Sequence, residues 1–366
     1  MPAESHAPWH DAVNLHRLAA MAAERLPAMV HDYFAGGAND EVTLRATREA
    51  WDAIPLRYRV LRDVSSCHLE TTILGRRHTW PVLVAPMAFQ RLAHPEGEVA
   101  MARACARADT GMILSTLATQ PLEAVRDAGA GVRWFQLYVY RDRQRTEQLV
   151  RRAERAGYEA IVVTVDAPML GRRERDLLNG FHVPSDLPVP NLDGAPRDLL
   201  ATQAPTASAL ARFVADHWDP SLAWADIAWL TSITSLPILL KGNVRGDDAV
   251  LALEQGVAGV IVSNHGGRQL DTAVPTARAL PEVAAAMAGR GTLLVDGGIR
   301  RGTDVVKALA MGADGVLLGR PALWGLAVGG EDGVVHALDL LREELSLAMA
   351  LCGAARLADL TADLIG

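Results

Sequence analysis

Eight short apolar segments alternate along the chain with longer segments of helical period, and this alternation constrains the fold more than any other feature. The apolar segments read as strands buried on both faces. They comprise residues 82–85, 112–115, 134–137, 160–164, 238–241, 259–263, 292–296 and 315–318. Strict alternation of strand and helix requires crossover connections and gives a parallel sheet. Eight such units close a (β/α)₈ TIM barrel, so the sequence predicts this α/β fold.

A doubly wound open sheet is the alternative arrangement. Such sheets usually carry a Gly-x-Gly-x-x-Gly turn after the first strand, whereas residues 85–88 read Ala-Pro-Met-Ala. We therefore expect one barrel domain over residues 1–366, with an N-terminal helical extension in residues 11–51 and a terminal helix in residues 343–351. The long loop of residues 179–205, rich in proline and glycine, follows the fourth strand and would lie over the rim as a lid.

The composition excludes several function classes. The chain carries a net charge of −7 with Lys and Arg scattered among Asp and Glu, so no nucleic-acid surface is predicted. No apolar stretch is long enough for a bilayer, and the amino terminus lacks the pattern of a signal peptide, so no membrane association is expected. Cys67, Cys105 and Cys352 are odd in number and far apart, which favours free thiols, no metal site and a cytoplasmic location.

Small, polar or charged residues stand at or just after the end of every predicted strand. In a parallel barrel these ends meet at one rim, where barrel enzymes carry their active sites. The residues are Pro86, Met87 and Ala88; Ser115; Gln136 and Tyr138; Thr164 and Asp166; Lys241; Ser263 and His265; Asp296 to Arg300; and Gly319 and Arg320. A solvated loop explains any one of them, but a common mouth explains the whole set better.

Two of these ends predict phosphate binding. Residues 296–300, Asp-Gly-Gly-Ile-Arg, follow the seventh strand, and Gly319-Arg320 follows the eighth. In barrels these two loops commonly bind phosphate through backbone N–H groups and a helix N-terminus. Glycine permits close approach, and the arginines add charge-assisted hydrogen bonds. Tight turns with surface arginines are the alternative explanation.

His265 combines features that suit a general base. It is the only one of the 11 histidines at a predicted strand end beside glycines and an arginine. An imidazole titrates near neutrality, and Asp166 can orient it and stabilise its cation. Arg268 offers a planar fork for a carboxylate. Tyr33 and Tyr138 are candidate hydroxyl donors to the same group.

Residues 259–271 resemble the active-site signature of the FMN-dependent 2-hydroxy-acid oxidases and dehydrogenases. Further segments match this family, in its order, at residues 26–34, 135–138, 164–173, 241–242, 296–302 and 319–321. The resemblance runs from about residue 15 to 360. It implies a TIM barrel with FMN as cofactor that oxidises an (S)-2-hydroxy acid to the 2-oxo acid, and it implies a homotetramer.

The resemblance also implies a role for each matching residue. His265, Asp166 and Tyr138 would be catalytic, and Tyr33, Tyr138, Arg173, Arg268, Leu117 and Met169 would meet the substrate. FMN would contact Pro86, Met87, Ala88, Ser115, Gln136, Thr164, Lys241, Ser263, Asp296, Gly297, Gly298, Arg300, Gly319 and Arg320. Within that set, Lys241 would stabilise negative charge on the reduced ring, and Arg300 would lie between the phosphate and the active site.

Three departures from the family pattern bear on the substrate. Leu117 stands where glycolate oxidases have tryptophan, Phe34 replaces a tyrosine, and Met169 replaces an arginine of the plant-type enzymes. Each change makes the pocket wider or more apolar. A bulky aromatic acid such as mandelate or 4-hydroxymandelate is therefore predicted. Lactate, glycolate and long-chain aliphatic 2-hydroxy acids are the alternatives.

Ala88 bears on the electron acceptor. Within the family, alanine at this position tends to accompany oxidases and glycine tends to accompany dehydrogenases, so O₂ is the predicted acceptor and H₂O₂ the product. A dehydrogenase with another acceptor is the alternative. A phosphate-binding barrel isomerase and a non-catalytic flavin-binding relative are further readings, but neither needs His265 and Arg268 together with Tyr33 and Tyr138.

Overall fold

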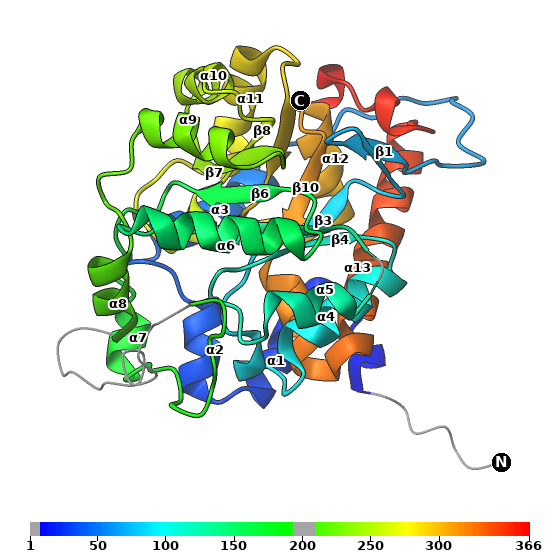
Figure 1. Cartoon of the computed structure of the whole chain (residues 1–366). Helices are drawn as coiled ribbons and strands as arrows, with labels where there is room; N and C mark the ends of the chain where they lie inside the picture. The colour runs from blue at the N-terminus through cyan, green and yellow to red at the C-terminus, as the bar shows by residue number, and fades with distance from the viewer. Residues whose placement is uncertain (1–7, 130, 193–208) are drawn as a thin grey trace.

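Eight parallel strands close into a barrel in the computed structural model, in the order β10-β3-β4-β5-β6-β7-β8-β9 (Figure 1). Their bounds are β3 Val82–Val84, β4 Gly111–Leu114, β5 Arg133–Leu137, β6 Ile161–Thr164, β7 Ile238–Asn243, β8 Gly259–Val262, β9 Thr292–Val295 and β10 Gly315–Leu318. The predicted TIM barrel is confirmed, and every strand lies within two residues of its predicted bounds. The structure describes residues 8–129, 131–192 and 209–366.

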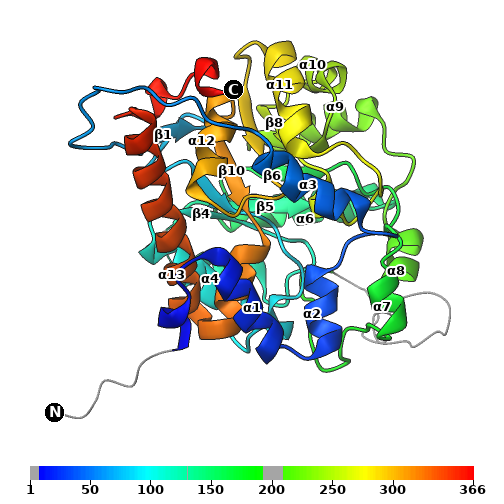
Figure 2. The same cartoon turned by 180° about the vertical axis from the view of Figure 1, so that it is seen from behind.

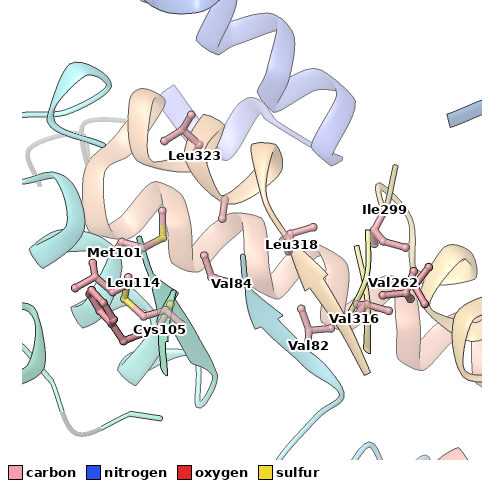
Figure 3. Packing of buried hydrophobic residues seen from close by; sticks show 14 of the residues in the cluster. Val82, Val84, Met101, Cys105, Leu114, Val262, Ile299, Val316, Leu318 and Leu323 are labelled. Atoms are coloured by element: carbon pink, nitrogen blue, oxygen red, sulfur yellow. The ribbon is translucent and has the colours of Figure 1, made fainter. Parts of the chain in front are cut away.

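The strands read as continuous apolar runs because the barrel packs on both of its faces. Residues such as Leu83 and Leu317 point into the barrel interior. Their neighbours Val84 and Leu318 face the surrounding helices, where they join the outer core with Met101 of α4 (Gly97–Arg107) (Figure 3). Alternation of polar and apolar residues is lost when both faces are buried.

Helices follow the strands around the barrel. They are α5 Leu122–Asp127, α6 Arg143–Arg155, α7 Glu174–Leu178, α8 Ala209–His217, α9 Trp224–Ile233, α10 Gly246–Glu254, α11 Thr276–Met287, α12 Gly302–Ala310 and α13 Arg320–Cys352. The predicted terminal helix is only the last part of α13, which begins at Arg320 and has non-helical backbone angles at Gly329 and Gly330. Within the described ranges, no helix is long and apolar enough to cross a membrane. Residues 193–205 of the predicted lid lie outside the described residues.

The amino-terminal extension is helical, as predicted, and brings residues to the active-site rim. It comprises η1 Pro8–Asp11, α1 Leu15–Arg25, α2 Ala28–Ala35 and α3 Val42–Asp52. The helix α1 lies beside α13 (Figure 2). The helix α2 contacts α7, and α3 contacts the short 3₁₀ helix η4 (His265–Gly267). The extension therefore covers the end of the barrel that carries His265.

A two-stranded hairpin covers the opposite end of the barrel. The strands β1 (Thr71–Ile73) and β2 (Arg76–His78) pair antiparallel. The side chain of Ile73 is fully buried and joins the barrel-interior core. A Cβ added at Gly315, where β10 begins, would lie 3.1 Å from Ile73 Cδ1. The hairpin thus closes the barrel with one isoleucine, and its mostly polar sequence gave no signal of this role.

Candidate active site

One cavity opens where the predicted site residues gather, beyond the carboxyl ends of the barrel strands. It contains about 1070 Å³ of empty space, including its open mouth. Its lining includes Tyr33, Pro86, Met87, Ala88, Ser115, Leu117, Gln136, Tyr138, Thr164, Arg173, Lys241, His265, Arg268, Asp296, Gly297, Gly298, Arg300, Gly319 and Arg320. The predicted residues Asp166, Ser263 and Met169 do not line it. Asp166 and Ser263 stand directly behind lining residues, whereas Met169 points elsewhere.

His265 and Asp166 form a buried pair at the ends of β8 and β6. His265 Nδ1 lies 2.9 Å from Asp166 Oδ1. His265 has a left-handed backbone conformation, with φ 56°, and its backbone N–H donates to Ser263 Oγ at 3.0 Å. Gly266 and Gly267 continue the turn with φ 65° and 75°. This tight turn directs the imidazole to the carboxylate and explains why two glycines follow the histidine.

The environment keeps the imidazole neutral. Burial lowers the pKa of His265, with Lys241 and Arg173 acting in the same direction, and the Asp166 carboxylate only partly opposes them. Burial alone would raise the pKa of Asp166, but the charge and hydrogen bond of His265 and the charge of Lys241 hold it below its ordinary value. With the Nδ1 proton donated to Asp166, the lone pair lies on Nε2. This nitrogen can accept a proton.

Two guanidinium groups flank the Tyr33 ring in the same cavity. The Cζ atoms of Arg268 and Arg173 lie 5.0 Å and 5.9 Å from the ring centre. Arg268 Nη1 donates to the carbonyl oxygens of Tyr33 at 2.5 Å and Gly36 at 2.9 Å. Burial, together with the charge of Arg173, lowers the pKa of Arg268 to about 10. Two cations held this close in a buried place favour an anionic ligand such as a carboxylate.

Each active-site tyrosine stacks on a second aromatic ring. Tyr33 stacks on Phe181, with ring centres 4.1 Å apart, and Tyr138 stacks on Trp218 at 3.6 Å. Burial raises the pKa of both tyrosines, and the charge of Asp166 adds to the increase for Tyr138. Both phenols therefore stay protonated near neutral pH and can donate hydrogen bonds.

A polar network joins the ends of β4, β5 and β6. Gln136 Nε2 donates to Thr164 Oγ1 at 3.0 Å, and Gln136 Oε1 accepts from Ser115 Oγ at 3.3 Å and from the backbone N–H of Thr116 at 3.1 Å. These bonds fix the amide orientation. The network presents donors and acceptors of the kind that the polar edge of a flavin ring requires.

Lys241, at the end of β7, is 4 % exposed and stays charged. Its Nζ lies 3.0 Å from Asp296 Oδ2 and donates to Ser263 Oγ at 2.9 Å. Burial lowers its pKa, but the carboxylates of Asp296 and Asp166 outweigh this effect and the pKa is raised. Ser263 therefore positions Lys241 and the His265 backbone rather than lining the cavity.

The turn after β9 and the start of α13 form the predicted phosphate end. Gly297 and Gly298 have φ 84° and 80°. A Cβ added at Gly298 would lie 2.7 Å from Trp51 Cδ1, and Trp51 Nε1 donates to the carbonyl of Gly297 at 2.8 Å. Arg320 stands at the first position of α13, where backbone N–H groups attract anions.

The positive charge of the cavity supports an anionic cofactor. Arg320 donates to the carbonyls of Phe34, Gly266 and Gly36 at 2.8–3.0 Å, and Arg300 donates to its neighbouring carbonyl. In the part of the chain that the structure describes, neither forms an ion pair. Burial lowers the pKa of Arg300 to about 10, and burial with the charges of Arg268 and Arg300 lowers that of Arg320 well below its ordinary value. A phosphate here would offset this charge, so the residues fit FMN.

The structure gives the predicted substrate contact of Met169 no support. Its side chain is 64 % exposed and does not line the cavity. Gln269 Nε2 donates to the carbonyls of Asp166 at 3.1 Å and Met169 at 2.8 Å, while Gln269 Oε1 accepts from the N–H of Gly171 at 3.0 Å. These bonds fix the turn with the methionine outward. Leu170 lines the cavity in its place.

Sequence reasoning missed residues that reach the site from distant segments. From α3, Trp51 contacts the Gly297–Gly298 turn, and Arg48 forms an ion pair with Asp304 at 2.6 Å. From α8 and the residue after it, Leu210 and Trp218 line the cavity. The amphipathic pattern of α3 gave only a helix, and no local motif marks Trp218.

Comparison with known proteins agrees with this geometry. The profile of the FMN-dependent dehydrogenase family matches residues 22–366. An L-lactate oxidase of Nostoc sp. is 50% identical over 352 residues, covering 95% of this chain and 96% of that protein. Glycolate oxidase 1 of Oryza sativa subsp. indica is 51% identical over 351 residues, covering 96% and 95%.

A solved structure of a mandelate oxidase with (S)-4-hydroxymandelic acid is similar over 95% of this chain and 97% of that chain, with a TM-score of 0.92 and 44% identity. The resemblance drawn from the sequence is thereby confirmed. The chain belongs to the FMN-dependent dehydrogenase family, and its cofactor is FMN.

Proposed function

We propose that this protein oxidises a bulky, aromatic (S)-2-hydroxy acid such as mandelate or 4-hydroxymandelate to the 2-oxo acid, with O₂ reduced to H₂O₂. The observation that carries the proposal is the joint presence, in one cavity, of the paired His265 and the two guanidinium groups of Arg268 and Arg173. An isomerase would need no such set, and a non-catalytic relative would have no reason to retain it.

The chain's own residues perform the binding and the proton transfer. Arg268 and Arg173 hold the substrate carboxylate, and the protonated phenols of Tyr33 and Tyr138 donate hydrogen bonds to the bound acid. His265 Nε2 accepts the proton that the substrate loses, and Asp166 stabilises the imidazolium that results. FMN, when bound, would supply the redox chemistry, as the acceptor of the two electrons and the second hydrogen of the substrate; both protons and both electrons would end on O₂ as H₂O₂.

The same residues that fit the cofactor would hold it in place. The glycine turn with Arg300 and Arg320 would bind the phosphate. Gln136 and its partners Ser115 and Thr164 would meet the polar edge of the ring, alongside the strand-end residues Pro86, Met87 and Ala88. The permanent charge of Lys241 would favour negative charge on the reduced ring.

The apolar part of the cavity supports the proposed substrate class. Leu117, Leu170 and Leu210 line it together with Phe34, on surfaces that carry no charge. Burying a phenyl ring there contributes roughly 1.5–3 kcal/mol. Among the similar proteins, the mandelate oxidase is named for an aromatic acid, whereas the lactate and glycolate oxidases are named for small ones.

A substrate panel tests the proposal. We expect kcat/KM for (S)-mandelate to exceed that for glycolate by roughly ten- to a hundredfold. (S)-Lactate and (S)-2-hydroxyoctanoate complete the panel, with peroxide production as the readout. A clear preference for glycolate would overturn the aromatic assignment while leaving 2-hydroxy-acid oxidation in place.

The proposal that O₂ is the electron acceptor rests on Ala88, which lines the cavity. Alanine is the residue that tends to accompany oxidases at this position in the family. Enzyme reduced by substrate without oxygen should reoxidise in air. Persistent reduction in air, relieved only by quinones or dyes, would favour a dehydrogenase.

The three free thiols suit the reducing cytoplasm that we propose as the location of the protein.

A further inference from the structure

A second cavity lies beside the active-site cavity and shares three wall residues with it. This side cavity contains about 1000 Å³ of empty space, including its open mouth. The shared residues are Tyr138, Thr164 and Trp218. The rest of its lining combines apolar residues such as Leu222, Trp224 and Ile227 with the polar Asp219, Asn243 and Asp248.

Trp218 is the largest of the three shared residues. It is 3 % exposed, and its indole stacks on the Tyr138 ring with 3.6 Å between ring centres and 16° between ring planes. Its Nε1 is buried without a hydrogen-bond partner among the described residues.

The backbone around Trp218 is anchored, so the indole has little freedom to withdraw. Trp218 pairs with Tyr140 in an antiparallel bridge, and the backbone N–H of Trp218 donates to the carbonyl of Val214 at 2.9 Å. The next residue, Asp219, donates from its backbone N–H to the carbonyl of Val139 at 3.0 Å and forms an ion pair with Arg143 at 2.5 Å. The backbone that carries Trp218 is therefore fixed by contacts with residues 139–143 and with Val214 of α8.

The charged groups of the active-site cavity set the direction of the substrate. Arg268 and Arg173 fix the carboxylate, so the side chain of a 2-hydroxy acid must occupy the apolar lining, which includes Leu117, Leu210 and Trp218. A longer side chain that stays buried on this side would have to pass the indole, because Trp218 lines both the active-site cavity and the side cavity. Trp218 therefore limits the buried length available toward the side cavity.

We propose that Trp218 is a specificity-determining residue that closes the substrate pocket toward the side cavity and so excludes extended aliphatic 2-hydroxy acids. Trp218 is also a positioning residue, because its indole stacks on Tyr138 and holds the phenol ring in place. Both statements rest on the proposed oxidation of 2-hydroxy acids. The side cavity offers apolar side chains such as Leu222 and Ile227 to an alkyl chain; of its unshared polar residues, Asp219 is paired with Arg143, and Asn243 and Asp248 form the rest.

The test is the ratio of kcat/KM for (S)-2-hydroxyoctanoate to kcat/KM for (S)-lactate. In the FMN-loaded Trp218→Ala variant this ratio should rise about tenfold or more, because several methylene groups gain a buried place. Trp224→Ala is the matched control, since Trp224 lines the side cavity but not the active-site cavity. The ratio for this variant should stay within about twofold of the wild-type value. An unchanged ratio in Trp218→Ala would overturn the proposal.

Refilling the side cavity provides a second test. Leu222 lines the side cavity and not the active-site cavity. Adding Leu222→Trp to Trp218→Ala should return the ratio toward the wild-type value, whereas Leu222→Trp alone should leave it unchanged. Such non-additivity is expected only if the two positions share one space. If the double variant keeps the full gain, the chain does not enter the side cavity and the proposal fails.

The positioning role has its own readout. Trp218→Phe keeps an aromatic ring against Tyr138 and should retain kcat for (S)-lactate, whereas Trp218→Ala should lower kcat with little change in KM. Equal kcat in the two variants would remove the positioning role. If Trp218→Ala does not retain FMN, Trp218→Leu replaces it in the ratio test. Absence of oxidation of every 2-hydroxy acid by the FMN-loaded wild type would instead reject the proposed function.

Discussion

Asp166 Oδ1 lies 2.9 Å from His265 Nδ1, while Oδ2 of the same carboxylate is buried without a hydrogen-bond partner among the described residues. The carboxylate therefore retains an unshared oxygen and faces one imidazole and the charge of Lys241. This is an arrangement in which a proton arriving on His265 strengthens an existing hydrogen bond rather than creating a new one.

The first prediction concerns the pH dependence of kcat/KM. The proposed base acts as a neutral imidazole, so activity is lost as the pH falls through the pKa of His265. Burial lowers this pKa below its ordinary value of 6.5, which places the acid limb below pH 6.5. Asp166→Asn removes the charge that raises the pKa, so the limb should move to still lower pH while kcat falls. A pH profile of both proteins checks this, and a limb that moves upward would contradict it.

Replacement of His265 should abolish most substrate-driven bleaching of the FMN absorbance. The loss should be roughly 10²–10⁴-fold, the usual effect of removing a general base. His265→Asn is preferred to His265→Ala, because asparagine tolerates the left-handed conformation that His265 adopts at φ 56°. The variant should bind FMN as the wild type does. Near-wild-type reduction by (S)-mandelate would show that the base is elsewhere.

Arg268→Lys should weaken substrate binding even though the charge is kept. Arg268 donates to the carbonyls of Tyr33 and Gly36 and still has N–H groups for a carboxylate, whereas lysine has no planar fork. Loss of a charge-assisted bond of about 1.5–3 kcal/mol predicts roughly a ten- to hundredfold fall in kcat/KM. Met169→Ala serves as the control, because its side chain is exposed outside the cavity. Equal effects in the two variants would show that Arg268 does not bind the substrate carboxylate.

Gly298→Ala should weaken FMN binding and lower Tm. The added Cβ would lie 2.7 Å from Trp51 Cδ1, at a residue whose φ is 80°. Gly75→Ala is a matched control, since Gly75 has a φ of 72° and nothing within 4 Å of an added Cβ. Left-handed strain of about 1–2 kcal/mol is common to both, so any further loss isolates the contact with Trp51. FMN titration by fluorescence and thermal unfolding measure the two effects, and identical results would exclude a tight cradle at Gly298.

Sequence patterns predicted the barrel because its strands carry a strong local signal. Parallel strands buried on both faces read as uninterrupted apolar runs, and the strand ends marked the rim. The hairpin β1–β2 gave no such signal, because only one of its side chains, Ile73, enters the barrel interior. The full length of α13 was also missed, since Gly329 and Gly330 interrupt its pattern.

Within the site, the sequence predicted the residues that follow strands and missed those that arrive from elsewhere. His265 and Arg268 are adjacent in one motif, so a single segment revealed both. Trp218 reaches the cavity, and Trp51 reaches the Gly297–Gly298 turn, through tertiary packing that no local pattern encodes. The outward position of Met169 could not be predicted, because the turn that carries it is held by Gln269, about 100 residues later. The extent of the domain and the homotetramer stay predictions.

The break in α13 divides one long helix into two lengths with different attachments. Residues 320–328 begin at Arg320, whose guanidinium faces the cofactor cavity, whereas residues 331–352 belong to the outer wall. Between them, added Cβ atoms would meet the Trp9 ring at Gly329 and the His94 ring at Gly330, so both glycines are fixed by packing. Amide hydrogen exchange in the first length should therefore slow when FMN binds, while exchange in the second length follows global unfolding. We therefore expect cofactor loss to loosen residues 320–328 and to leave residues 331–352, beyond the Gly329–Gly330 break, unchanged.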